Sequence, residues 1–138
     1  MRVTVTFDKR LPLVGLNEKK QKTIFDASLD FAGEAKHASP MEVVLESLAA
    51  CSMMDIIVIL NKMKKALASL DVALEASRAD DHPKVFTSIH LKYRLTGSGC
   101  GLEEFRRAVA LSIEKYCSVA AMLRASGCGI TWEAEVCS

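Results

Sequence analysis

Apolar residues are most concentrated between residues 39 and 65 of the chain. This stretch contains no Gly, and its one Pro is Pro40, at the start, where a helix tolerates a missing N–H group. Ser39 and Glu42 form the Ser-x-x-Glu pattern of a capping box, in which each residue satisfies a free backbone N–H of the other. The pattern predicts a long helix over residues 39–65.

The middle of this predicted helix is apolar on every side. Between residues 53 and 60 the one polar residue is Asp55. A helix that is apolar all round has to be covered all round, so we expect a central buried helix. The apolar run is too short for a membrane span, and acids interrupt the stretch at Glu42, Glu46 and Asp55, so no crossing of a membrane is expected.

Alternating apolar and polar residues predict strands on both sides of the helix. A polar link that contains His82-Pro83 joins two alternating runs within residues 71–95, which is typical of an antiparallel hairpin. The other predicted strands cover residues 2–7, 11–16, 22–27 and 130–136.

Residues 102–125, after a Gly/Ser turn at 97–101, have helical periodicity. A break at Cys117-Ser118 divides them into two helices, and Ser126-Gly127 ends the second. The apolar stripe of the first helix consists of Leu102, Phe105, Val109, Ile113 and Tyr116.

The order of these elements predicts one α+β domain over residues 1–138, with a largely antiparallel sheet. Its parts are the N-terminal strands (1–38), the central helix (39–65), the hairpin (71–95), the paired helices (102–125) and the C-terminal strand (130–136).

The charge balance argues against two classes of partner. Eighteen Lys and Arg stand against 17 Asp and Glu, which gives a net charge of +1. This leaves no electrostatic argument for binding nucleic acid or an anionic membrane. Because no signal peptide precedes the first predicted strand, the cytoplasm is the expected compartment.

The spacing of the cysteines excludes several kinds of site. Their number is odd and no secretory signal is seen, which argues against a structural disulfide framework. None is in a Cys-x-x-Cys pair, so neither a zinc site nor a thioredoxin-like pair is indicated, and we expect no metal and no cofactor. The cysteines are Cys51, Cys100, Cys117, Cys128 and Cys137.

Two of these thiols are candidates for chemistry, although each could equally be a packed core residue. Cys51 lies among small residues in the predicted central helix. Cys117 lies at a helix junction, where free N–H groups would lower the pKa of its thiol. Glu42 is either half of the capping box or an acid available to Cys51, and Asp55 needs a hydrogen-bond partner if it is buried.

Three segments together carry a family resemblance. The block SPMEVVLESLAACSMMDIIVILNKMKK (39–65), the segment HPKVFTSIHLKY (82–93) and the segment LSIEKYCSVAAML (111–123) resemble the OsmC-like family of OsmC and organic hydroperoxide resistance proteins, and its small, less characterised branch in particular.

The resemblance implies an intertwined homodimer, with antiparallel sheets wrapped around long central helices and active sites at the interface. It also implies a thiol peroxidase in which Cys51 attacks an organic hydroperoxide and becomes a sulfenic acid. Cys117 would then form a disulfide with Cys51, and a dithiol reductant would restore both thiols. Glu42 is the acid that this resemblance places nearest to the family's activating Glu.

The sequence departs from the well-studied branches at the activating residues. Their Glu directly after the helix-start Pro is Met41 here, and their activating Arg has no clear counterpart, Arg10 being the one Arg between Arg2 and the helix. An alternative hypothesis is therefore a dimeric binding module or redox sensor that keeps the fold and the thiols without turning over a substrate.

Overall fold

The computed structural model of the chain describes residues 1–66, 68–97 and 99–137 and has the α+β architecture that the sequence predicts. Ser98, in the predicted Gly/Ser turn, lies outside the described residues. The chain divides into two compact units, Met1–Glu46 and Ser47–Ser138.

The first unit contains an antiparallel sheet of order β1-β2-β3. Its strands are β1 (Val3–Thr6), β2 (Leu13–Asn17) and β3 (Lys22–Phe25), close to the predicted ranges. The turn between β2 and β3 is held by the side chain of Asn17, whose Oδ1 accepts the N–H groups of Lys19 and Gln21, each at 3.0 Å. Asn favours such turns because its side chain can replace a backbone acceptor.

Helix α1 (Pro40–Lys62) begins in this unit with the predicted capping box. The Glu42 N–H donates to Ser39 Oγ at 3.2 Å, and the Ser39 N–H donates to Glu42 Oε1 at 3.0 Å. These bonds from Ser39 lower the pKa of the Glu42 carboxyl group, because they favour its ionised form. The carboxylate of Glu42 therefore has a structural role at the start of the helix.

In the second unit α1 is buried on one face. The buried residues Leu48, Ser52, Ile56 and Leu60 recur every four positions. On the other side, Met54 and Val58 are 66% and 51% exposed, and Ile57 is exposed as well. The apolar composition predicts that the helix is covered on every side, but the described residues of this chain cover only one face of it.

By its length and composition alone, helix α1 could cross a membrane. Core helices of soluble proteins pass the same test. Its buried face packs in a core with the sheet and helices of the second unit, as in such a core helix, and no membrane span is indicated.

The sheet of the second unit has the order β4-β5-β6. Strands β4 (Ser69–Arg78) and β5 (Phe86–Thr96) form the predicted antiparallel hairpin, whereas β6 (Gly129–Cys137) pairs with β5 in parallel. One face of β5 is buried and the other is polar, with ion pairs such as Arg94–Glu135 at 2.9 Å. This alternation is what identified the strands in the sequence.

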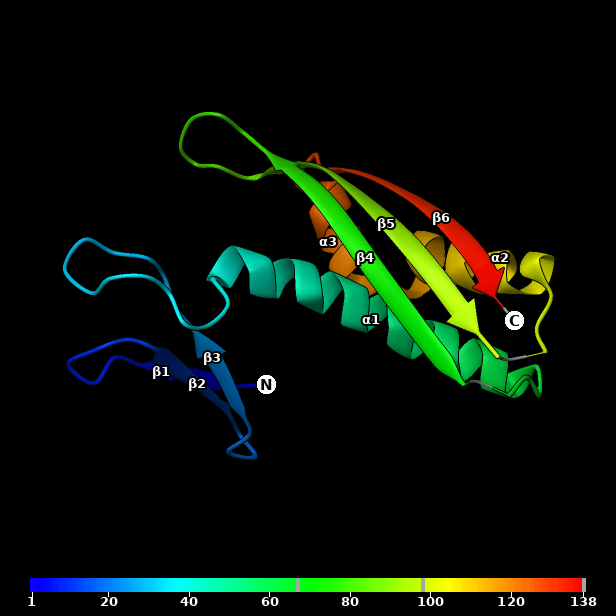
Figure 1. Cartoon of the computed structure of the whole chain (residues 1–138), viewed down its shortest axis with the longest axis horizontal. Helices are drawn as coiled ribbons and strands as arrows, with labels where there is room; N and C mark the ends of the chain where they lie inside the picture. Colours follow the sequence, from blue (N-terminus) through cyan, green and yellow to red (C-terminus); the bar gives the residue numbers. More distant parts are fainter. Residues whose placement is uncertain (67, 98, 138) are drawn as a thin grey trace. The chain divides into compact units, whose positions relative to one another are not determined.

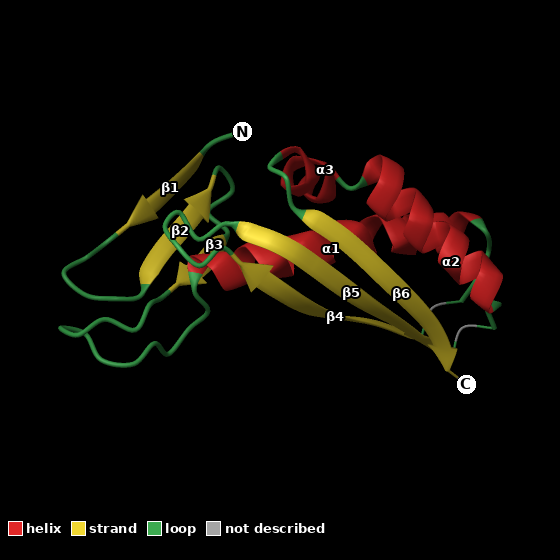
Figure 2. Cartoon of the chain, turned by 90° about the horizontal axis from the view of Figure 1, so that it is seen from above, coloured by secondary structure: helices red, strands yellow, loops and turns green. Residues whose placement is uncertain are grey.

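Helical segments cover one face of this sheet (Figures 1 and 2). They are the second-unit part of α1, helix α2 (Leu102–Leu111), a π-helical turn η1 (Ser112–Tyr116) and helix α3 (Ser118–Ala125). The buried core between the two layers includes Leu48, Ile56, Leu60, Ile89, Leu91, Leu95, Phe105, Val109 and Ile113.

The substitution Ser39→Ala should lower the free energy of unfolding by about 1 kcal/mol, because it removes the capping hydroxyl at the start of α1. Urea unfolding followed by circular dichroism measures this change. The matched control is Ser47→Ala, at an exposed position inside the same helix, which should be neutral or slightly stabilising because Ala has the higher helix propensity. Equal stability of the two variants would contradict the capping role.

Candidate functional site

Helix α1 presents three polar or reactive side chains on neighbouring turns. Cys51 is half-buried, Ser52 is completely buried, and Asp55 is half-buried one turn further along. Positions that are three or four residues apart lie on the same side of a helix, so Asp55 is a neighbour of Cys51 and Ser52. This part of α1 is therefore the helix side of the candidate site.

The π turn η1 brings Cys117 into the core. The Cys117 N–H donates to the Ser112 carbonyl at 2.7 Å, five residues back rather than the four of an α-helix. The additional residue places Cys117 above Ser112, where an α-helix would place Tyr116. Cys117 is accordingly 2% exposed and Tyr116 is 52% exposed, so the predicted inward position of Tyr116 is wrong.

Cys117 also caps the helix that follows. Its sulfur accepts the Ala120 N–H at 3.4 Å, and this bond lowers the pKa of the thiol as the sequence suggests. Burial has the larger and opposite effect, and the nearby Cys51 side chain raises the pKa further. The net result is a pKa of about 11, so the predicted lowering is wrong.

The structure brings the two candidate thiols together. The Cys51 side chain interacts with the Cys117 thiol through a hydrogen bond and electrostatically. Neither cysteine is in a disulfide bond. Cys51 is the more accessible of the two. Solvent therefore reaches the Cys51 sulfur more readily than the Cys117 sulfur.

Buried hydroxyl groups link the elements around this thiol pair. Tyr93 Oη donates to Ser52 Oγ at 2.7 Å, and Ser52 Oγ donates to the Ala49 carbonyl at 2.9 Å. Ser112 Oγ lies 3.0 Å from both the Ser52 carbonyl and Asp55 Oδ2. The partner that the sequence requires for Asp55 is thus Ser112.

Tyr93 is also close to ionisable groups of the site, Cys117 and Asp55. Burial raises the pKa of its hydroxyl, the hydrogen bond with Ser52 opposes this effect, and the charges of Cys117 and Asp55 add to it. The sequence analysis identifies Tyr93 only as an inward residue of β5 and gives no role to Ser52 or Ser112. The signal that could have identified Ser52 and Ser112 is a polar residue at a helix position whose neighbours on the same face are apolar.

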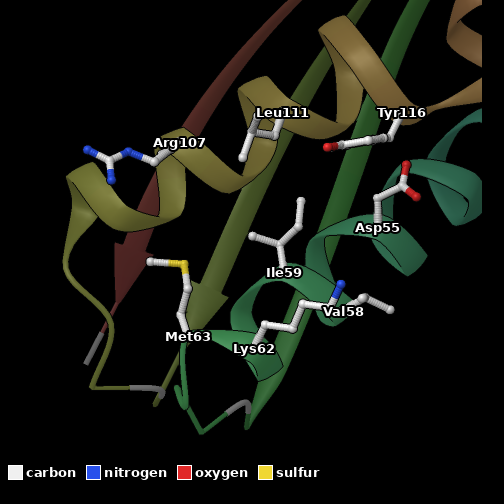
Figure 3. Close-up of a pocket in the computed structure, with 8 residues that line it drawn as sticks. All are labelled: Asp55, Val58, Ile59, Lys62, Met63, Arg107, Leu111 and Tyr116. Carbon is white, nitrogen blue, oxygen red and sulfur yellow. The ribbon is translucent and has the colours of Figure 1, made fainter.

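A pocket of about 520 Å³ begins at Asp55 and Tyr116 (Figure 3). Side chains from α1 and the residue after it line one side, and side chains from α2 and η1 line the other. Its lining is mainly apolar, with cationic side chains as well. The lining residues are Asp55, Val58, Ile59, Lys62, Met63, Arg107, Leu111 and Tyr116.

The remaining cysteines lie elsewhere in the second unit. Cys100 and Cys128 are buried, and the pKa of each thiol is raised, chiefly by burial. Cys137 is half-buried at the end of β6. Within the described part of the chain, His, Cys, Asp and Glu side chains form no group of three or more that could hold a metal ion.

Comparisons with known proteins agree with this architecture. The model of a family described as OsmC-like protein matches residues 33–133. Protein YhfA of Escherichia coli strain K12 is 35% identical over 123 residues, which cover 89% of each chain.

Two solved structures extend the comparison. A hypothetical protein from Aquifex aeolicus VF5 has a TM-score of 0.79 and 29% identity, over 98% of this chain and 96% of that chain. The organic hydroperoxide resistance protein OsmC from Legionella pneumophila has a TM-score of 0.70 and 18% identity, over 97% and 95% of the two chains. The second likeness shows the shared fold.

The two thiols should differ in their reaction with iodoacetamide. At pH 8 Cys51 should be alkylated about tenfold faster or more than Cys117, because the thiolate is the reactive form and Cys117 is buried with a pKa of about 11. The Cys117 rate should rise about tenfold per pH unit until it levels off near that pKa. Peptide mass mapping measures each rate.

Unfolding the chain in urea is the control for this experiment. It should return the Cys117 thiol towards its ordinary pKa of 9.0 and remove most of the difference. Equal alkylation of the two cysteines in the folded chain would contradict the described burial.

Proposed function

The chain belongs to the OsmC-like protein family, and from this premise we propose that it is a thiol-dependent peroxidase that reduces organic hydroperoxides in defence against oxidative stress. The observation that carries the proposal is the pairing of an accessible free thiol, Cys51, with a buried free thiol, Cys117. A redox-active cysteine needs access to solvent and a second thiol within reach.

The reaction would proceed in two steps on these sulfurs. The Cys51 thiolate attacks one oxygen of the O–O bond, which becomes the sulfenic acid, while the other oxygen leaves with the organic group and takes up a proton as the alcohol. The Cys117 sulfur then attacks the Cys51 sulfur, and the sulfenic oxygen leaves as water. A dithiol reductant restores both thiols by exchange.

The pocket beside Asp55 supports an organic substrate. Two of its lining residues are neighbours of the thiols in the chain, since Asp55 is one turn from Cys51 and Tyr116 directly precedes Cys117, and neither cysteine itself lines the pocket. Its lining by Val58, Ile59 and Leu111 would favour the organic group of a hydroperoxide through burial of apolar surface. Hydrogen peroxide has no such group.

A homodimer in the cytoplasm is part of this proposal. The exposed apolar residues Met54, Ile57 and Val58 lie on the side of α1 that the described part of this chain leaves uncovered. A second copy would bury them, and such burial stabilises association by about 25 cal/mol for each Å² of apolar surface.

A redox sensor or binding module on the same fold is the second candidate. The carboxylate of Glu42 is engaged in the capping box, which favours a site without an activating acid. In that case the thiols would oxidise and be reduced without steady consumption of hydroperoxide.

The substitution Cys51→Ser should abolish consumption of cumene hydroperoxide in the presence of a dithiol, because it removes the attacking sulfur. Cys117→Ser should allow the first step and stop the cycle there, so that Cys51 accumulates as sulfenic and then sulfinic acid. Peroxide consumption and intact mass measure the two effects. Hydrogen peroxide, as the comparison substrate, should react more slowly than cumene hydroperoxide with the unaltered chain.

The matched control for these variants is Cys128→Ser, which removes a buried thiol outside the pair and should leave the rate unchanged. Full activity in Cys51→Ser would exclude the proposed peroxidase. Oxidation to the disulfide without turnover in the unaltered chain would favour the sensor.

Glu42 is the acid that the family resemblance suggests for the peroxidase reaction, and two variants separate this proposed role from its role in the cap. Glu42→Gln keeps an oxygen that can accept the Ser39 N–H, whereas Ser39→Ala removes the capping hydroxyl. Only Glu42→Gln removes the negative charge, so it should lower the peroxidase rate by about tenfold, the effect of one pKa unit at a reacting group. Equal rates in the two variants would assign Glu42 to the cap alone.

Sedimentation velocity of the unaltered chain should give the mass of a dimer. Met54→Glu should shift the population towards the monomer, because it would bury a charge without a partner. Lys64→Glu, which changes an exposed position beyond the end of α1, is the control. A stable monomer of the unaltered chain would contradict the proposed dimer.

A further inference from the structure

Ser112 bonds to both elements that carry the thiols. Its carbonyl accepts the Cys117 N–H at 2.7 Å, and this bond closes the π turn. Its hydroxyl lies 3.0 Å from the Ser52 carbonyl and 3.0 Å from Asp55 Oδ2. Because Ser52 directly follows Cys51, one buried residue joins the main chain beside Cys51 to the main chain of Cys117.

The hydroxyl of Ser112 has one hydrogen and two acceptors. A carboxylate forms the stronger hydrogen bond, so Asp55 is the preferred acceptor and the Ser52 carbonyl is the second. Ser112 is 0% exposed, so its hydroxyl has no water as an alternative partner. The hydroxyl therefore holds η1 against α1 through two alternative bonds.

The π turn needs a restraint of this kind. π turns are rare, and the α-helical arrangement is the ordinary alternative for the same residues. In that alternative Tyr116 would occupy the position above Ser112, and Cys117 would rotate away from it by about 100°. A bond that fixes Ser112 against α1 opposes this change of register.

We propose that the buried hydroxyl of Ser112, bonded to Asp55 and to the Ser52 carbonyl, is a positioning device that keeps the π turn in register and so holds Cys117 beside Cys51 before a disulfide forms. Ser112 and Asp55 are positioning residues, since the bonds that form and break are those of the two sulfurs. Its contribution to catalysis rests on the proposed peroxidase function. There it would accelerate the step in which Cys117 forms the disulfide with oxidised Cys51.

A glutathione redox buffer tests the device without any hydroperoxide. Glutathione disulfide oxidises the full-length chain: the Cys51–Cys117 disulfide bond forms, the glutathione S–S bond breaks, and two glutathione thiols are released with the two protons of the protein thiols. Peptide mass mapping gives the equilibrium constant and the rate for this pair. Thiols that are held together should have a high effective concentration towards each other.

Three variants are compared with the unaltered chain. Ser112→Ala should lower the equilibrium constant for the disulfide by about tenfold, the equivalent of one buried hydrogen bond. Asp55→Ala should lower it by about threefold, because the Ser52 carbonyl still accepts from Ser112. Asp55→Asn should restore most of the loss, since its amide oxygen can accept the same bond.

Combining Ser112→Ala with Asp55→Ala should add nothing to the effect of Ser112→Ala, because the two residues act through one bond. The matched control is Ser118→Ala, which removes an exposed hydroxyl next to Cys117 and should change nothing. Urea unfolding of the reduced proteins shows that each variant is folded. If Ser112→Ala does not fold, the comparison of Asp55→Ala with Asp55→Asn carries the test.

Two results would overturn the positioning role. Equilibrium constants within about twofold of the unaltered chain in folded Ser112→Ala and Asp55→Ala would show that the bonds stabilise the oxidised and reduced forms equally. Equal losses in Asp55→Ala and Asp55→Asn would assign the effect to charge rather than to the bond. Absence of peroxidase turnover would reject the proposed function and leave these measurements unaffected.

Discussion

Buried hydroxyl groups at the contact of α1 with η1 and β5 constrain the arrangement of the second unit. Tyr93, Ser52 and Ser112 are 1% exposed or less, in a core that is otherwise largely aliphatic. Within the described residues, each buried side-chain oxygen or nitrogen has a hydrogen-bond partner. A buried hydroxyl without a partner would cost about 1–3 kcal/mol, so only arrangements that keep all these bonds remain favourable.

These bonds fix the helices at the point where the thiols meet. Ser52 and Ser112 are each close in sequence to a thiol, and Tyr93 holds Ser52 from the sheet side. The same arrangement leaves Cys51 accessible and closes the core over Cys117. The buried hydroxyl groups of Tyr93, Ser52 and Ser112 thus give the thiol pair a defined geometry. Buried polar contacts of this kind contribute more to a unique arrangement of the core than to the free energy of unfolding.

Elements that depend on local signals could be predicted from the sequence. The capping box of Ser39 and Glu42 and the alternation along β4 and β5 are written within a few residues, and the structure contains both. The parallel pairing of β6 with β5, in contrast, depends on the path of the chain between them.

The candidate site was less predictable, because its properties depend on packing between distant segments. The π turn is held by bonds between Ser112 and the distant helix α1. The local sequence is equally compatible with an ordinary α-helix that has Tyr116 on its apolar stripe. The pKa of Cys117 depends on how deeply the thiol is buried, and the helix-junction signal gives the smaller effect. The sequence indicates that residues 53–60 need cover, but it does not contain the identity of what covers them.

The interaction between the two thiols also bears on the order of the proposed steps. Burial is the main reason that the Cys117 pKa is high, and the hydrogen bond and negative charge of Cys51 raise it further. With a pKa of about 11, the Cys117 thiol is neutral near pH 7 and would not compete for the hydroperoxide in the proposed reaction. Oxidation of Cys51 to a neutral sulfenic acid removes that charge, which lowers the cost of ionising Cys117 at the stage where it has to attack. In the proposed reaction the pair would thus keep its second nucleophile neutral until the first has reacted.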